Sequence, residues 1–452
     1  MGELAVGQRC EVLINDLGHD GQGIGRCGEA VVFLPGALPG EPVRARLVRR
    51  ARRHWLALLE EVLDPSPDRR RQPCILAGTC GGCSLQHLAP EAQVAWKRRV
   101  VADALERIGG LPHPVEPVLA STETLGYRNR AIIPLERRGD GSVGCGYYRR
   151  GSHRIVNLNH CPVLDPRLDR LVEPIKADLA ATSWPIDRDG GGGLRHLALR
   201  VGRHTGELLI SLISSHDRLP GMAALAARWR RRWPAVVGVS LNLQPQANNV
   251  LMGPETRVIA GQGSIRERFG DHLLEIATDT FFQVFTEQAE RVLPFLRSAL
   301  TRHPTPGLAI DAYCGIGTFS LPMAAAGWRV EGLEVNPQAV RQAQRNAGLN
   351  GLADRCSFHS CAVADSLAAR LPEAGLLLLD PPRRGLDPVV LGTILASPPR
   401  QLLYLSCDPS SLARDLAVLV HDGPYALEQV QPFDFFPHTT HVETLALLQR
   451  RP

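Results

Sequence analysis

The chain has no long apolar run and no recognisable export signal. No stretch of its 452 residues approaches the ~18 consecutive apolar residues that a membrane-spanning helix needs. The segment MGELAVGQRC lacks the charged leader and apolar core of a secretion signal. We therefore expect a cytoplasmic protein that does not enter a membrane, and we expect it to be a monomer.

Lysine is almost absent, since it occurs only at Lys97 and Lys176, so nearly all positive charge is carried by arginine. The formal net charge is only +5, and charge alone does not identify a nucleic-acid partner. Arginine nevertheless binds phosphate through planar, bidentate contacts, so its placement is informative. With 44% hydrophobic residues, the chain is long enough for two or three domains with their own cores.

Residues 1–66 alternate short apolar runs with Gly, Asp and Pro turns, a pattern typical of a small β barrel. The expected strands cover residues 8–17, 23–27, 29–34, 42–48 and 55–63. Six arginines and no acid lie between Arg44 and Arg53, which indicates a surface for RNA phosphates. A solvated strand and loop is the alternative. The segments GHDGQGIGR and PGALPGEPVRARL resemble the TRAM domain, an RNA-binding barrel of several RNA-modifying enzymes.

The chain has eleven cysteines, and an odd number without a secretion signal favours metal binding or catalysis over disulfides. Cys74, Cys80 and Cys83 are separated by glycines that let the backbone wrap around a bound group. Three thiolates so close together predict a soft metal ion or an iron-sulfur cluster. Cys161 is the better fourth ligand because a proline follows it, and Cys145 is the other candidate. A zinc site with four cysteines also fits this spacing.

Residues 67–264 are expected to form a second domain. It begins with an amphipathic helix over about 90–112 and continues as a β meander. Arginine and tyrosine alternate along the meander, which suits stacking on bases while holding phosphates. An exposed sheet face with charged edges is the alternative. The residues concerned are Tyr127, Arg128, Arg130, Arg137, Arg138, Tyr147, Tyr148, Arg149, Arg150 and Arg154.

Residues 265–452 have the strand and helix order of a doubly wound α/β domain. The buried strand LAID leads into the glycine loop and helix AYCGIGTFSLPMAAAG, and the next strand, WRVEGLEVN, carries Glu334 near its tip. Such a loop approaches a nucleotide, and such an acid binds its ribose. The loop is not G-x-G-x-x-G, and Asp311 closes the first strand. Both features favour S-adenosylmethionine (SAM), which has no pyrophosphate, over a dinucleotide.

Three more residues are expected at the same edge of the sheet. LLLLDPPRRGLDP places Asp380 directly after a buried strand, and QLLYLSCDPSSLARDL places Cys407 between a strand and a helix. The N–H groups and the dipole of that helix favour the thiolate, which is the nucleophilic form of cysteine. A small buried residue at a strand end is the alternative. Glu443 lies at the start of the last expected strand.

Five of these segments resemble the catalytic domain of the RNA uracil-5-methyltransferase family: DAYCGIGTFSL, EVNPQAV, LLDPPRRGL, YLSCDPSSLARDL and PHTTHVETLALL. CILAGTCGGC resembles the pattern CPYAGxCGGC of family members with a [4Fe-4S] cluster. The resemblance covers essentially the whole chain and implies a multidomain α/β protein. Its first part is an OB-like TRAM barrel at 1–66. The second is a central α+β domain at 67–264, which binds the cluster and has a helix that packs on the catalytic domain. The third is a Rossmann-like SAM-dependent methyltransferase domain at 265–452.

The resemblance also implies the site. Cys407 would be the nucleophile and Glu443 the base, and the SAM contacts would come from Gln283, Tyr313, Thr318, Glu334 and Asp380. The cluster would be bound by Cys74, Cys80, Cys83 and Cys161, in a structural or RNA-positioning role. Many family members have asparagine where this chain has Thr318, so a cofactor contact there is either made by a hydroxyl or lost.

The implied reaction explains why these residue types are needed. Addition of a thiolate to C6 of uracil makes C5 nucleophilic toward the SAM methyl group, and a base then removes the C5 proton so that the cysteine can leave. We expect 23S rRNA as the substrate, with tRNA as the alternative. Two other classes remain: a noncatalytic RNA-binding or ribosome-assembly factor, and an RNA cytosine-5-methyltransferase. The latter usually has a Pro-Cys motif, whereas Arg383 follows the two prolines here.

Overall fold

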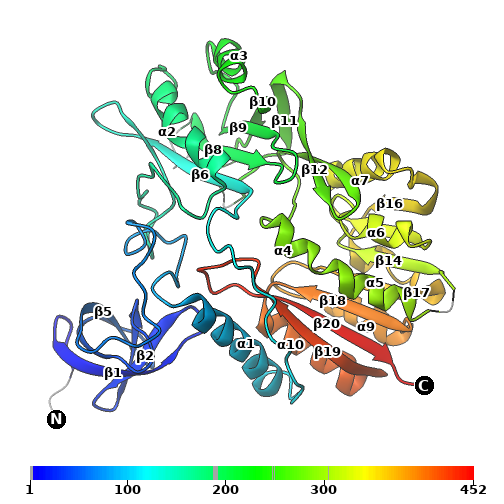
Figure 1. Ribbon diagram of the computed structural model, residues 1–452, viewed down its shortest axis with the longest axis horizontal. Coiled ribbons are helices and arrows are strands. Elements are labelled where there is room, and N and C mark those ends of the chain that lie inside the picture. The colour runs from blue at the N-terminus through cyan, green and yellow to red at the C-terminus, as the bar shows by residue number, and fades with distance from the viewer. Residues whose placement is uncertain (1–3, 187–191, 247, 249, 304) are drawn as a thin grey trace. The chain divides into compact units, whose positions relative to one another are not determined.

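The computed structural model describes residues 4–186, 192–246, 248, 250–303 and 305–452 (Figure 1). Contacts within the chain divide it into two compact units. Unit 1 comprises Met1–Val100, Tyr148–Arg154 and Phe436–His441, and unit 2 comprises Val101–Tyr147, Ile155–Phe435 and Val442–Pro452. None of the helices in the described part of the chain is long and apolar enough to cross a membrane.

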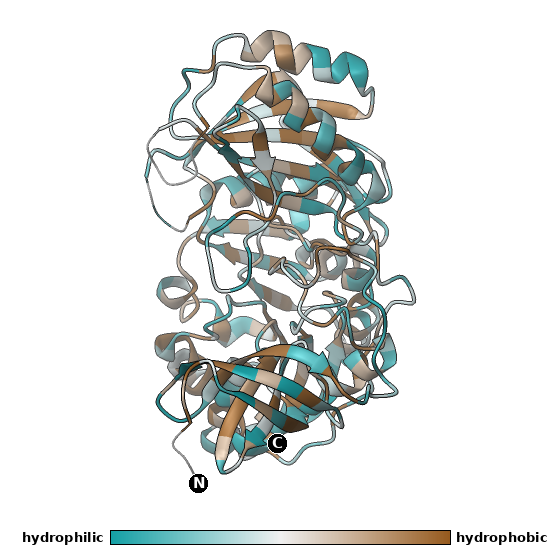
Figure 2. Cartoon of the chain, turned by 90° about the vertical axis from the view of Figure 1, so that its left-hand side faces the viewer, coloured by the Kyte–Doolittle hydropathy of each residue, from teal (hydrophilic) through white to brown (hydrophobic). Residues whose placement is uncertain are grey.

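Unit 1 begins with a closed five-stranded barrel in the order β1-β2-β3-β5-β4. The strands are β1 (Arg9–Leu17), β2 (Gln22–Cys27), β3 (Ala30–Pro35), β4 (Pro42–Arg50) and β5 (Trp55–Val62). Alternate side chains such as Val12, Ile14, Val43 and Leu47 fill the barrel core. The barrel strands, near the N label of Figure 2, accordingly carry both hydrophobic and hydrophilic residues. The expected barrel is confirmed, and each strand end lies within two residues of its expected position.

Helix α1 (Pro90–Arg107) starts in unit 1 and continues into unit 2. It is shorter than the expected 90–112, because two glycines follow its last turn. Gly110 has a φ of 61°, which favours glycine, and the N–H of Leu111 donates to the carbonyl of Leu105 at 2.9 Å. This closes the helix in the manner of a glycine C-cap.

Unit 2 contains a six-stranded sheet in the order β11-β10-β9-β8-β6-β7. Its elements are β6 (Arg130–Arg137), β7 (Val143–Cys145), α2 (Pro166–Ala180), β8 (Leu194–Val201), β9 (Leu208–Ser214), α3 (Met222–Arg232), β10 (Val236–Leu243) and β11 (Glu255–Gly261). Helix α2 contacts β8, and α3 contacts β10 and β11. On the sheet itself the hydroxyls of Ser211 and Ser240 hydrogen-bond to that of Thr278, so the segment after residue 277 lies against the sheet.

A hairpin and two helices connect this sheet to the next one. They are β12 (Ser264–Phe269), β13 (His272–Ala277), α4 (Thr286–Glu290) and α5 (Leu293–Thr301). The segment between β13 and α4 carries Gln283, one of the residues expected to bind SAM.

The second sheet of unit 2 has seven strands in the order β16-β15-β14-β17-β18-β20-β19. The strands are β14 (Leu308–Ala312), β15 (Arg329–Glu334), β16 (Cys356–Ser360), β17 (Ala374–Leu379), β18 (Gln401–Ser406), β19 (Tyr425–Phe433) and β20 (Glu443–Arg450). The helical segments are α6 (Ser320–Ala325), α7 (Pro337–Leu349), η1 (Ala353–Arg355), α8 (Val363–Ser366), η2 (Leu371–Glu373), α9 (Pro388–Ala396), α10 (Pro409–Ala417) and η3 (Val418–Asp422). The first five strands of the domain are parallel, and β20 is antiparallel to β18.

The strand order of this sheet reverses between β14 and β17, and ligands of open α/β sheets bind at the carboxyl edge of that point. Leucines and other apolar residues of the sheet share one core with α8, α9 and α10. The part of α1 that belongs to unit 2 joins the same core through Val101, Ala104 and Leu105. These layers leave the carboxyl ends of β14, β15, β17 and β18 at one edge of the sheet.

Candidate active site

Cys407 and Glu443 come from neighbouring strands at the carboxyl edge of the seven-stranded sheet. In the antiparallel register of β18 and β20, Ser406 is opposite Thr444. The next position on each strand toward the edge is Cys407 and Glu443. Asp380 directly follows β17, which pairs with β18 on its other side. The sheet therefore brings three of the predicted residues to one place.

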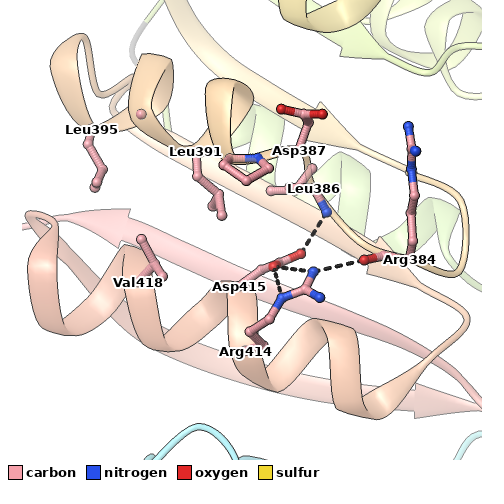
Figure 3. A pocket seen from close by; sticks show the side chains of 10 residues that line it. Arg384, Leu386, Asp387, Leu391, Leu395, Arg414, Asp415 and Val418 are labelled. Atoms are coloured by element: carbon pink, nitrogen blue, oxygen red, sulfur yellow. Dashed lines mark hydrogen bonds and ion pairs between the residues drawn. The ribbon is translucent and has the colours of Figure 1, made fainter.

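A buried carboxylate holds the loop that follows β17 (Figure 3). Asp415 accepts hydrogen bonds from the N–H of Leu386 at 2.8 Å and from the hydroxyl of Tyr404 at 2.7 Å. Arg414 donates to Asp415 and also to the carbonyl of Arg384, both at 2.8 Å. The ARDL segment of α10 thus positions the DPPRRGL loop on which Asp380 lies.

A cavity of about 660 Å³ lies beside this clamp, between α9 and α10 (Figure 3). Leu391, Leu395 and Val418 form an apolar wall, and Asp387 lies at its rim. None of the residues that we expected in the site lines this cavity, so it is not the catalytic pocket.

The electrostatics of Cys407 differ from the expectation of a preformed thiolate. Burial and the carboxyls of Glu443 and Asp380 raise the pKa of the Cys407 thiol to about 12, although Arg383 opposes this. The helix that follows does begin as expected, with Asp408 capping the N–H of Ser411 at 2.8 Å. The prediction of a thiolate was wrong, because desolvation and two nearby carboxyls outweigh the end of one helix.

Glu443 and Asp380 are also protonated more readily than ordinary carboxyls. Burial, followed by Asp380, raises the pKa of Glu443 to about 8. Burial and Asp311 raise the pKa of Asp380 to about 7. The charge of Arg383 opposes the raised pKa of both Glu443 and Cys407, so Arg383 lies near the predicted site although our sequence analysis did not place it there. Its place in the sequence could have indicated this, since Arg383 is the first residue after the two prolines that follow the buried strand.

The opposite half of the edge has the features expected of a nucleotide site. The carboxylate of Glu334 accepts the N–H of Gly315 at 3.1 Å and of Asn336 at 2.8 Å, which joins the glycine loop to the tip of β15. Tyr313 has a φ of 69°, a left-handed conformation that is uncommon for tyrosine and often found at functional sites. Thr318 lies partly exposed in the same loop, directly before Phe319 and α6.

Gln283 lies on the segment between β13 and α4 and is 5% exposed. Its carbonyl accepts a hydrogen bond from the side chain of Asn129 at 2.9 Å. The structure thus places all five predicted SAM residues in unit 2. Tyr313, Thr318 and Asp380 lie in loops at the carboxyl edge of the sheet, Glu334 is the last residue of β15, and Gln283 lies on a separate segment.

An amide ladder fixes the strand that leads to Gln283, and sequence analysis missed it. The side chains of Gln342, Asn346 and Asn350 on α7 accept the N–H groups of Ala277, Glu275 and Leu273 on β13 at 3.0, 2.8 and 2.9 Å. These side chains therefore supply β13 with the hydrogen-bond acceptors that a neighbouring strand would otherwise provide. The spacing of the three amides by four residues was the available signal.

The three clustered cysteines share one loop of unit 1. Arg150 donates to the carbonyl of Cys83 at 2.7 Å, and burial raises the pKa of Cys80. Within the described ranges, no group of three or more His, Cys, Asp or Glu side chains is arranged to hold a metal ion. Cys161 belongs to unit 2. The arrangement of these cysteine side chains does not show a fit for an iron-sulfur cluster.

The same cysteine loop is hydrogen-bonded to the loop that precedes Glu443. The N–H groups of Ser84 and Leu85 donate to the carbonyl of His438 at 3.0 and 2.9 Å. Gln93 of α1 accepts the N–H of His438 at 2.9 Å. These contacts lie within unit 1 and give the segment Phe436–His441 a fixed conformation.

Part of the arginine and tyrosine meander has a structural role, contrary to the RNA-facing interpretation. Tyr127 is 1% exposed and stacks on Phe285 with ring centroids 4.9 Å apart. Arg130 donates to the carbonyl of Thr278, and Arg137 donates to carbonyls at the end of α2, including that of Leu179. These three side chains contact other parts of unit 2, which gives them a structural role instead of the predicted contact with RNA.

The arginine run of the barrel is partly neutralised by the neighbouring strand. Arg44 pairs with Glu61 at 2.5 Å, and Arg46 pairs with Glu60 at 2.9 Å. The acids that the run itself lacks are thus supplied by β5. Later arginines of the run, Arg49, Arg52 and Arg53, are exposed, and they are the better candidates for phosphate contacts.

The fold and the edge residues define a class, a Rossmann-like SAM-dependent methyltransferase preceded by a small β barrel. The TRAM domain family matches residues 3–54, the tRNA (uracil-5-)-methyltransferase family matches residues 371–451, and the RNA cap guanine-N2 methyltransferase family matches residues 307–389. The chain belongs to the RNA uracil-5-methyltransferase family.

Relatives and a solved structure agree with this assignment. A protein named as an uncharacterized RNA methyltransferase from Parasynechococcus marenigrum is 51% identical over 98% of this chain and 96% of its own length. Another of the same description, from Nostoc sp., is 45% identical over the same shares. The tRNA (uracil-54, C5)-methyltransferase of Pyrococcus abyssi, solved with S-adenosyl-L-homocysteine, is 26% identical with a TM-score of 0.78. That match covers 97% of this chain and all of the other chain.

Proposed function

We propose that this protein methylates C5 of a uridine in RNA through a covalent bond between Cys407 and the base. The observation that carries this mechanism is the register of β18 and β20, which sets Cys407 beside Glu443 at the cofactor edge of the sheet. A thiol and a carboxyl at neighbouring positions can add to a base and then remove a proton from it. A noncatalytic RNA-binding factor would not need this pairing.

The proposed reaction consists of addition to C6, methyl transfer to C5 and elimination of the cysteine. The thiol of Cys407 loses its proton to solvent, and its sulfur adds to C6 of uracil while the electron pair of the C5–C6 bond moves onto the enolate. C5 takes the methyl group that SAM supplies, the bond between that methyl group and the sulfonium sulfur breaks, and S-adenosyl-L-homocysteine is left. Glu443, which loses its own proton to solvent before this step, then removes the C5 proton as a carboxylate, the C5–C6 double bond re-forms, and the C6–S bond breaks to release Cys407. Arg383 favours the charged forms of both residues.

We propose 23S rRNA as the substrate, with tRNA as the second candidate. The match to the TRAM domain supports RNA binding in general, and the resemblance of the cysteine loop to that of family members with a cluster supports rRNA, whereas the name of the Pyrococcus abyssi enzyme supports tRNA. Mapping of 5-methyluridine in rRNA and tRNA from cells that lack this protein distinguishes the two. Loss of one rRNA position supports the first proposal, and loss of a tRNA position alone contradicts it.

We also propose that Cys74, Cys80, Cys83 and Cys161 bind a [4Fe-4S] cluster. The support is the number and spacing of the sulfurs in the sequence, since three of them lie on one loop. Protein purified without oxygen is then expected to be brown and to contain iron and sulfide. Colourless, zinc-loaded protein with full activity would contradict the proposal and leave the chemistry at Cys407 unaffected. A cytoplasmic monomer also stays a prediction.

A further inference from the structure

A second cavity, of about 230 Å³, lies between α7 and the strands that approach it. Its walls come from β11, the end of β13 and the first turns of α7, which follows directly on β15. The first turns of α7 therefore lie at the carboxyl edge of the sheet, where Glu334 ends β15. Asp279 and Thr280 line the cavity on the segment that continues to Gln283.

The cavity contains a buried donor without a partner. The side chain of Gln342 is fully buried, and its oxygen accepts the N–H of Ala277 at 3.0 Å. Its Nε2 makes no hydrogen bond, and Gln342 lines the cavity. A buried amide nitrogen left without an acceptor destabilises the folded state, so an acceptor in the cavity would restore that free energy.

Exposed arginines on the same side of α7 add positive charge to the rim. Arg341 and Arg345 line the cavity one helical turn apart. Arg345 reaches Glu275 only at 3.8 Å, and no ion pair of Arg341 occurs among the residues that the structure describes. The residue with this guanidinium and the residue with the unpartnered amide nitrogen therefore line the same cavity.

The acceptor groups of the cavity are already used. The carboxylate of Asp279 accepts the hydroxyl of Thr256 at 2.8 Å, and it also accepts the amide of Gln338 at 3.1 Å when that amide is turned so that its nitrogen faces the acid. Arg341, Arg345 and the Nε2 of Gln342 are donors among the residues that line the cavity, and the space suits a small group better than a whole nucleotide. The complementary ligand is small, anionic and rich in acceptors.

We propose that this cavity binds one phosphodiester group of the RNA substrate, held by Arg341 and the Nε2 of Gln342. The proposal rests on RNA as the substrate but not on the covalent mechanism at Cys407. Because Thr278, Asp279 and Thr280 line the cavity on the segment that continues to Gln283, the contact would hold the RNA strand near one of the residues predicted to bind SAM. Such a phosphate contact positions the strand without reading its sequence.

The first test compares two arginines in the full-length protein. Binding of a fluorescein-labelled strand of twenty uridines is measured by anisotropy at several salt concentrations for Arg341→Gln and Arg400→Gln. Arg400 is equally exposed but directly precedes β18, at the opposite edge of the same sheet. We expect Arg341→Gln to weaken binding several-fold and to reduce the slope of log K against log salt by about 0.7, the loss of one phosphate contact. Equal effects of the two substitutions would overturn the proposal.

The second test separates a site from general surface charge. Val258, 50% exposed, lines the cavity, and Val258→Trp would fill it without removing any charge. We expect this substitution to weaken binding as much as Arg341→Gln does, with no further loss in the double variant. Additive losses, or normal binding by Val258→Trp, would contradict the proposal. Calorimetry with SAM checks folding, and a loss confined to SAM affinity would mean that the cavity serves the cofactor instead.

Discussion

The barrel strand β4 and the carboxyl edge of the seven-stranded sheet both concentrate charge, but in opposite surroundings. Arg44 and Arg46 of β4 are partly exposed and paired with acids of β5. At the sheet edge, Asp380 and Glu443 are withdrawn from water, and their pKa values rise to about 7 and about 8. Side chains whose charges stay in water can add to the affinity for RNA at little cost in stability. Ionisable side chains that are buried have shifted pKa values and can take part in chemistry.

This difference predicts where substitutions act. A change at the sheet edge should alter the rate or the protonation of the site, while a change on the barrel should alter only how tightly RNA binds. The predictions below test that division, beginning with the largest expected effect.

Removal of the nucleophile should abolish the reaction. We expect Cys407→Ala to lower methyl transfer by at least ~10⁴-fold, because no other group of the edge can make C5 nucleophilic. Transfer of labelled methyl from SAM to RNA measures this. Cys361→Ala, a cysteine at the end of β16, is the matched control and should stay active. Turnover by well-folded Cys407→Ala would refute the mechanism.

The charge of the cofactor should favour the thiolate of Cys407. Burial and two carboxyls raise the pKa of this thiol to about 12, and a sulfonium bound at the same edge would lower it, whereas S-adenosyl-L-homocysteine has no such charge. We therefore expect iodoacetamide to alkylate Cys407 faster at pH 8 with SAM than with S-adenosyl-L-homocysteine. Peptide mass spectrometry gives the rates. Identical rates with the two ligands would show that the cofactor does not control this thiol.

The buried carboxyls should make stability depend on pH. In the folded protein the pKa of Glu443 is about 8 instead of 4.5, so above pH 4.5 the folded state holds a proton that the unfolded state has lost. Its contribution to the free energy of unfolding is fully present below about pH 4.5 and is lost as pH rises through 8. We expect the unfolding temperature to fall by several degrees between pH 5.5 and 8.5, and by less in Glu443→Gln.

Exposed Glu373→Gln is the control for that experiment, since its side chain is 74% exposed. Thermal unfolding followed by circular dichroism should show the wild-type dependence on pH in this variant. If Glu443→Gln and Glu373→Gln behaved alike, the carboxyl of Glu443 would not be protonated at neutral pH in the folded protein.

The barrel arginines should have the smallest effect, and only on affinity. Replacement of Arg49, Arg52 and Arg53 by alanine should weaken RNA binding about tenfold at low salt and flatten its salt dependence. Replacement of Arg44 and Arg46 should do less, because their guanidinium groups already pair with Glu61 and Glu60. A change in which uridine is modified, with an unchanged salt slope, would contradict the role of the run as a phosphate contact.

Local pattern predicted much of the fold and the sheet edge, but it did not predict their electrostatics. The barrel strands, the acids near the ends of β14 and β15, and the acid after β17 follow from alternating residues and turn signals. The protonation state of Cys407 depends on carboxyls that come from or follow other strands, and only the pairing of those strands in the fold brings them close. The amide ladder of α7 and the internal roles of Arg130 and Arg137 were missed for the same reason, since each depends on a distant partner.

The central claim is the division of labour between Cys407 and Glu443, and one measurement tests it directly. Glu443→Gln is incubated with SAM and substrate RNA, and the products are examined by denaturing electrophoresis and intact mass. We expect a covalent complex that carries one methyl group, joined through Cys407, because addition and transfer proceed while removal of the C5 proton stalls. The same complex should be absent from the double variant with Cys407→Ala. Normal release of methylated RNA by well-folded Glu443→Gln would contradict the account.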